Sequence, residues 1–307
     1  MKVTRLDLDG TGSPEGLVAK ILKAEPTLSY PIPIEDLAAA LDIEEIASLD
    51  TEAFEGGLLM RPHRSSGIIL VNKAAPSGRR RFTIGHELGH FCILSHKPIE
   101  GDRFLCSRDD MRQWSVSEKD TYARMEMEAN KFSALLLMPP PLLRKYMTKL
   151  GDPDLLNILA IHEDFDVSKD AAARSYAQYH DQPIALAVVR DGKVLRIYQH
   201  IKFPRLSVLP NSDVPSASCY WRVSKSRTLP TELSEVPAGQ WLESNWGQPM
   251  PELFEQVLHQ RLGYALILLW PELTKEEDEY DPDENRTSKE RLADRRARWV
   301  SDGRTRR

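Results

Sequence analysis

Two stretches in the first half of the chain have the spacing of apolar residues that is typical of helices with one buried face. Within residues 82–94, apolar side chains stand at Ile84, Leu88 and Phe91, three or four positions apart. Residues 118–137 repeat this period and end at three consecutive prolines, before which the α conformation is disfavoured. The pattern therefore predicts two helices, each buried along one side.

The first 50 residues are also predicted to be mostly helical. Ser13-Pro14 is a typical helix start, because serine caps free backbone N–H groups and proline fits the first helical turn. A second helix is expected to begin at Ile34.

Strand patterns lie on both sides of this helical region. Residues 56–60 and 67–72 are short apolar runs joined by a polar turn, and residues 184–189 and 194–198 flank an Asp-Gly pair that favours a tight hairpin. The period changes from helical to strand-like near residues 178–183, so we expect a domain boundary there. Two later apolar segments, the second being the better strand candidate, are residues 253–257 and 264–270.

Candidate chemistry lies on the first predicted helix, in the run His86-Glu87-Leu88-Gly89-His90. Histidines four positions apart project from one face on consecutive turns, where they can share a tetrahedral zinc ion, and Glu87 then points at the remaining position. The alternative is a helix that carries two histidines by chance, but buried histidines without partners are costly. The glycines beside the histidines suit close approach of another element or of a substrate backbone.

A third metal ligand is predicted on the second helix. Glu126 and Asn130 are four positions apart and share a face. This spacing suits a carboxylate ligand followed, one turn on, by an amide that holds the far ring nitrogen of His86. The alternative for Glu126 is a surface glutamate. Glu128 faces elsewhere on the helix and is interpreted as a solvated charge.

These two motifs together resemble the ImmA/IrrE family of metallo-endopeptidases. The run from Arg79 to Phe91 resembles the family's active-site helix, and the run from Glu126 to Pro139 resembles its second motif. The resemblance extends over roughly residues 15–180, including an entry segment at residues 31–43. It also includes residues 165–168, which open a short helix in the family. Residues 95–117 look like an insertion relative to compact members, which would change the shape of the substrate cleft.

The resemblance implies that His86, His90 and Glu126 hold zinc and that Glu87 is the general base. Manganese or iron would suit the same ligands. It further implies a small sheet against the zinc helix, with an edge that binds extended substrate by strand addition.

One role in the reaction is left without a residue, the donor that would stabilise the oxyanion beside the metal. His96, His162 and Tyr176 are candidates, although each is more typical of a surface or packing residue.

The predicted fold class is α+β, with three parts. Residues 1–180 form a mainly helical zinc-peptidase domain with a small β-sheet, and residues 181–272 form a smaller, strand-rich α/β domain. Some family members carry a GAF-like sensory region at this place, so a sensory or substrate-docking role is one interpretation of the four tryptophans at 221, 241, 246 and 270. Aromatic packing is the other. Residues 273–307 are a charged tail, expected to be disordered.

Composition limits the remaining classes. The net charge of −5 gives no general attraction to nucleic acid or anionic membranes, so no direct DNA binding is expected. We find no signal-peptide pattern and no apolar run long enough to span a membrane. The three cysteines, at 92, 106 and 219, have no paired spacing, which is typical of a reducing cytoplasm; Cys92 is expected to pack in the core.

The sequence thus predicts a cytoplasmic zinc-dependent endopeptidase. The family resemblance suggests as substrate a helix-turn-helix transcriptional repressor, cleaved to relieve repression in a stress response or in mobile-element regulation. Two alternatives act by protein binding: a non-catalytic metal-binding sensor or scaffold, and a toxin–antitoxin-type partner protein. Glu87 weighs against the sensor, since metal binding alone needs no base there. Oligomeric state is not predicted.

Overall fold

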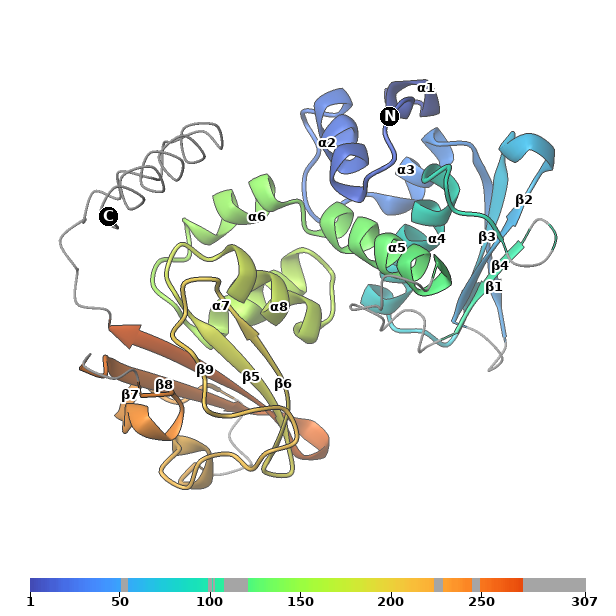
Figure 1. Ribbon diagram of the computed structural model, residues 1–307. Helices are drawn as coiled ribbons and strands as arrows, with labels where there is room; N and C mark the ends of the chain where they lie inside the picture. The colour runs from blue at the N-terminus through green and yellow to red at the C-terminus, as the bar shows by residue number, and fades with distance from the viewer. Residues whose placement is uncertain are drawn as a thin grey trace, which may run out of the picture. The chain divides into compact units, whose positions relative to one another are not determined.

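The computed structural model describes residues 1–50, 55–98, 101, 103–107, 121–223, 229–244 and 249–272. Met1–Pro271 form one compact unit in which eight described α-helices accompany two β-sheets, so the α+β class is confirmed (Figure 1). None of the described helices combines the length and the apolar character that crossing a bilayer requires. The predicted tail at 273–307, Trp246 and residues 108–117 of the predicted insertion lie outside the described residues.

The N-terminal segment contains three helices: α1 (Arg5–Leu8), α2 (Pro14–Ala24) and α3 (Ile34–Ala40). Both predicted helix starts are confirmed, and the Ser13 hydroxyl caps α2 by accepting a hydrogen bond from the Gly16 N–H at 3.2 Å. The prediction of a helical segment is wrong after α3, where strand β1 (Ile43–Leu49) follows. Parallel pairing with a strand further along the chain decides this conformation, and local propensity does not reveal it.

The first sheet has four strands in the order β1-β3-β2-β4. Strands β2 (Gly56–Met60) and β3 (Gly67–Asn72) are antiparallel, as the two apolar runs predict. Strand β4 (Arg103–Cys106) pairs antiparallel with β2 on its other side. The sequence did not predict β4, because it lies in the segment interpreted as an insertion.

The two central helices of this region are α4 (Ser77–Cys92) and α5 (Thr121–Leu137), which pack side by side next to the first sheet (Figure 1). Their contact depends on the two glycines of α4. A Cβ atom added at Gly85 would lie 2.6 Å from Ser133 Oγ, and one at Gly89 would lie 3.1 Å from Phe132 Cδ1. Of the two roles predicted for these glycines, the structure shows close approach of another element, helix α5.

Three further helices follow α5: α6 (Pro140–Met147), α7 (Leu155–Asp164) and α8 (Lys169–Tyr179). The Ser168 hydroxyl caps α8 by accepting from the Ala171 N–H at 3.1 Å. The arginine run at the start of α4 is paired rather than free, since Arg80 forms an ion pair with Glu35 and Arg81 lies 3.5 Å from Asp166.

The second sheet has five strands in the order β6-β5-β9-β8-β7. The predicted Asp-Gly hairpin is confirmed, with Asp191 and Gly192 at φ values of 49° and 80° between β5 and β6. The bounds are β5 (Ala185–Arg190), β6 (Lys193–Gln199), β7 (Ser234–Val236), β8 (Glu252–His259) and β9 (Tyr264–Glu272). Short 3₁₀ turns occupy Pro62–Arg64, Cys219–Trp221, Ala238–Gln240 and Arg261–Gly263.

Both faces of this second sheet are covered. Leu186 and Leu268 belong to the large core that also includes the helices, whereas Ala187 and Ile267, one position away on their strands, belong to a second core with Trp241. Trp241 is buried, so aromatic packing explains this tryptophan. The large core contains residues on both sides of 178–183, and the domain boundary there stays a prediction.

Candidate metal centre

Three side chains from α4 and α5 converge at one buried point. The Nε2 atoms of His86 and His90 are 3.1 Å apart. Glu126 places Oε2 3.2 Å from Nε2 of His86 and Oε1 3.3 Å from Nε2 of His90. All three side chains are fully buried. The spacing of four on α4 puts both rings on the helix face that meets α5.

The far nitrogen of the His86 ring has a partner that fixes its tautomer. Nδ1 of His86 lies 3.0 Å from Oδ1 of Asn130, one turn after Glu126 on α5. An amide oxygen only accepts, so Nδ1 carries the proton of the neutral ring. The lone pair on Nε2 of His86 therefore points toward Glu126.

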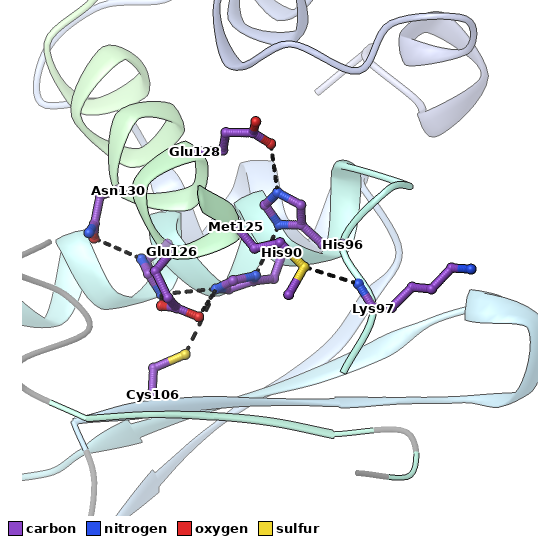
Figure 2. Close-up of polar contacts among 9 residues, drawn as sticks. His90, His96, Lys97, Cys106, Met125, Glu126, Glu128 and Asn130 are labelled. Carbon is purple, nitrogen blue, oxygen red and sulfur yellow. Dashed lines mark hydrogen bonds and ion pairs between the residues drawn. The ribbon is translucent and has the colours of Figure 1, made fainter. Parts of the chain in front are cut away.

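His90 is oriented by a chain of two further residues. Its Nδ1 lies 3.0 Å from Nδ1 of His96, and Nε2 of His96 lies 3.0 Å from Oε2 of Glu128 (Figure 2). Burial lowers the pKa of His96, which keeps this ring neutral with a proton on one nitrogen only. The Glu128 carboxylate accepts a hydrogen bond from Nε2 of His96. Nδ1 of His96 therefore has no proton and accepts a hydrogen bond from Nδ1 of His90. The lone pair on Nε2 of His90 thus also points into the site.

This chain corrects two interpretations of the sequence. Glu128 is not simply a solvated charge, because it pairs with buried His96 and its side chain is 30% exposed. His96 has both ring nitrogens engaged, which argues against it as the oxyanion donor.

The other two oxyanion candidates also have partners away from the metal centre. The Tyr176 hydroxyl is buried and accepts a hydrogen bond from the Asn157 side-chain amide at 3.0 Å. Nδ1 of His162 contacts the backbone carbonyl of Val167.

The residues at the centre fit a metal ion. Two imidazole lone pairs and a carboxylate face one another at 3.1–3.3 Å. A proton bridges only one such pair, whereas a cation contacts all three groups. Around tetrahedral zinc with bonds of about 2.0–2.1 Å, ligand atoms are about 3.3 Å apart, which matches these distances.

Electrostatics around the centre favour a cation. Burial lowers the pKa of His90 to about 3. Burial also opposes charge on Glu126, but its contacts with His86 and His90 outweigh burial and hold the pKa of Glu126 below its usual range. For His86, Glu126 and the charge of Glu87 outweigh burial and raise the pKa. Negative charge thus dominates the site.

Glu87 lies inside the same buried region, directly after His86 on α4, and is fully buried itself. After Glu126, the charge of Glu87 contributes to the raised pKa of the His86 ring. The role of Glu87 as the general base stays a prediction.

The structure adds a residue that the sequence did not single out. Sγ of Cys106, on β4, lies 3.9 Å from Nε2 of His90. Ligand atoms of His86, His90, Glu126 and Cys106 all lie within 4.8 Å of one another. A single cysteine outside any motif gives no ligand spacing, so nothing in the sequence indicated this role. Cys92, by contrast, packs in the core, where burial raises its pKa to about 12.

Comparison with known proteins places this centre in a family. Residues 45–175 match the IrrE N-terminal-like domain of the peptidase family M78. This part of the chain belongs to the ImmA/IrrE metallopeptidase family. The matched residues include α4 and α5 and therefore the whole candidate metal centre.

Two individual similarities accompany the ImmA/IrrE family match. The radiation response metalloprotease IrrE of Deinococcus radiodurans is 29% identical over 126 residues, which cover 41% of this chain and 35% of that protein. The match thus spans about a third of the length of that relative. A solved Mycobacterium tuberculosis transcriptional regulator aligns over 87% of this chain and 73% of its own, at 11% identity and a TM-score of 0.45, too low a likeness to support an argument.

Proposed function

We propose that this protein is a zinc-dependent endopeptidase whose metal is held by His86, His90 and Glu126. The observation that carries the proposal is the meeting of two imidazole lone pairs and one carboxylate at 3.1–3.3 Å in a buried place. Membership of a metallopeptidase family supports the same reaction. Manganese or iron would fit the same donor atoms, and metal analysis distinguishes them.

The reaction assigns a separate task to each residue. Bound zinc would supply a water of lowered pKa and polarise a peptide carbonyl. Glu87 would take a proton from the attacking water and return it to the leaving amine. Asn130 holds the His86 ring in its tautomer, and His96 with Glu128 does the same for His90.

As substrate we propose a helix-turn-helix transcriptional repressor in the cytoplasm. This part rests on the family and on a relative whose name joins a radiation response to a metalloprotease. In the proposed division, residues 1–180 are the peptidase domain and residues 181–272 a sensory or docking domain. The negative net charge of the chain agrees with an indirect effect on DNA, through the repressor.

The test compares the wild type with Glu87→Gln, which keeps the size of the side chain and removes its basicity. Glu163→Gln is a matched control, because Glu163 is exposed on α7, outside the metal centre. Each form is expressed in the same host with candidate repressors. Metal content is measured on the purified proteins, and newly formed protein N-termini are mapped by labelling and mass spectrometry.

We expect all three forms to hold one zinc ion per chain. A new N-terminus within a repressor should appear with the wild type and Glu163→Gln and be lost with Glu87→Gln, a loss of activity of about 100-fold or more. Equal cleavage by Glu87→Gln at full metal content would refute the peptidase role. Repressor binding without cleavage by any form would favour the sensor or the toxin–antitoxin-type partner.

A further inference from the structure

Strand β4 covers the metal centre with one of its faces. Its residues alternate between exposed and buried, so the buried Phe104 and Cys106 point to the same side. On that side the Phe104 ring stacks on the His90 ring, with centroids 4.5 Å apart and planes at 20°. The next inward-facing side chain after this aromatic contact is Cys106, whose sulfur points toward Glu126 and His90 (Figure 2).

The backbone holds Cys106 in this position. Cys106 pairs with Gly56 of β2, and its carbonyl accepts a hydrogen bond from the Glu55 N–H at 3.1 Å. A Cβ atom added at Gly57 would lie 3.0 Å from the Phe104 carbonyl oxygen, so this glycine allows β4 to approach β2 closely. The register of the sheet, rather than a loose loop, thus sets the position of the sulfur.

The distances place the sulfur within reach of the metal. A tetrahedral zinc ion with a Zn–S bond of about 2.3 Å and a Zn–N bond of about 2.0–2.1 Å separates its sulfur and nitrogen ligands by about 3.6 Å. The observed 3.9 Å between Sγ and Nε2 of His90 exceeds this by only about 0.3 Å, which a small side-chain or strand movement supplies. A thiol that ligates zinc releases its proton to solvent.

The geometry points to Cys106 as a fourth protein ligand, which occupies the position that a catalytic water needs. This inference rests on the proposed metal site. Zinc sites with four protein ligands are closed, whereas catalytic sites keep one position for water. Among the described residues, β4 is an outer strand with β2 as its neighbour, so a shift of β4 breaks one strand pairing only. The chain would therefore exist in a closed form with sulfur bound and an open form with Cys106 withdrawn.

X-ray absorption of the zinc-loaded full chain measures the ligation directly. The expected result for the wild type is a sulfur neighbour at about 2.3 Å with nitrogen or oxygen neighbours at about 2.0–2.1 Å. Cys106→Ser should lose the sulfur neighbour and keep the lighter ones. Cys219→Ser is the matched control, since Cys219 is a buried cysteine of the second core, and it should behave as the wild type.

Cobalt substitution gives an independent measurement of the same contact. Cobalt-loaded wild type and Cys219→Ser should show a sulfur-to-cobalt charge-transfer band in the near ultraviolet, and Cys106→Ser should lose it while retaining the visible d–d bands. The zinc affinity of Cys106→Ser should also fall, by about 10-fold or more.

The outcomes separate this inference from the proposed function. Wild type that binds one zinc ion with nitrogen and oxygen neighbours only would refute ligation by Cys106 and leave the three-ligand peptidase site intact. Wild type that binds neither zinc nor cobalt would refute both. Both wild-type measurements decide the question even where Cys106→Ser fails to fold.

Discussion

Two buried glutamates in different parts of the molecule have opposite surroundings. Glu126 lies between α4 and α5 and faces two ring nitrogens. Glu255, on β8, accepts hydrogen bonds from the Ser218 hydroxyl at 2.6 Å and from the Trp241 ring N–H at 3.0 Å. Both side chains are fully buried, so burial does not distinguish them.

The difference lies in what each carboxylate meets. The Glu255 carboxylate already accepts hydrogen bonds from two donors. Burial outweighs the effect of these hydrogen bonds and raises the pKa of Glu255. The pKa of Glu126 is lowered instead, because its histidine contacts outweigh burial. A buried carboxylate indicates a metal site where lone pairs surround it, and a structural role where N–H and O–H groups do.

The largest difference between the two glutamates is expected when each is exchanged for alanine. Glu126→Ala should lower zinc affinity by more than about 100-fold, beyond the effect of losing a residue that only orients a ligand. Glu255→Ala should keep one zinc per chain but lose about 2–4 kcal/mol of unfolding free energy, because buried donors lose their acceptor. Metal titration and denaturant unfolding measure the two effects. Full zinc affinity in Glu126→Ala would contradict the assignment of this ligand.

Removing the amide that orients His86 should have a smaller effect on the same site. Asn130→Ala leaves the three ligands in place but frees the tautomer and rotation of the ring, so zinc affinity should fall by about 10–100-fold. Isothermal titration with zinc checks this, and Lys131→Ala, an exposed neighbour on α5, is the control. Equal affinity in Asn130→Ala and the control would show that the contact at 3.0 Å does not orient the ring.

The smallest effect is a difference in pH dependence at Glu255. Its raised pKa means that the folded protein binds this proton more tightly than the unfolded chain, whose ordinary value is 4.5. The unfolding free energy of the wild type should therefore decrease, relative to Glu255→Gln, as pH rises from about 4.5 through the folded pKa. Unfolding curves of both proteins across this range measure the slope. A wild type that gains stability over the variant as pH rises would reverse the sign.

The parts of the fold that the sequence predicted have local causes. Helical periodicity marks α4 and α5, and the Asp-Gly pair marks the hairpin of β5 and β6. The same spacing explains why His86 and His90 share a face. Strand β1 was missed, because its exposed acidic residues hide a strand that pairing with β3 decides.

Other features of the centre have no local cause. Cys106 and the contact between His96 and Glu128 join segments that are distant in sequence, and neither has a motif or a spacing. Only the packing of α5 and β4 against α4 brings these side chains together. Pairs of this kind follow from tertiary structure, which a single sequence does not reveal.

Because the ligands lie on two helices, a bound metal would also stabilise the fold. His90 lies on α4 and Glu126 lies on α5, so an ion bound by both would connect two helices that are separated along the chain. The unfolded chain offers no such ready-made arrangement, and whatever free energy the ion gains on binding is added to that of folding. A shortage of the ion would then lower the fraction of folded protein, in addition to leaving the site without its metal.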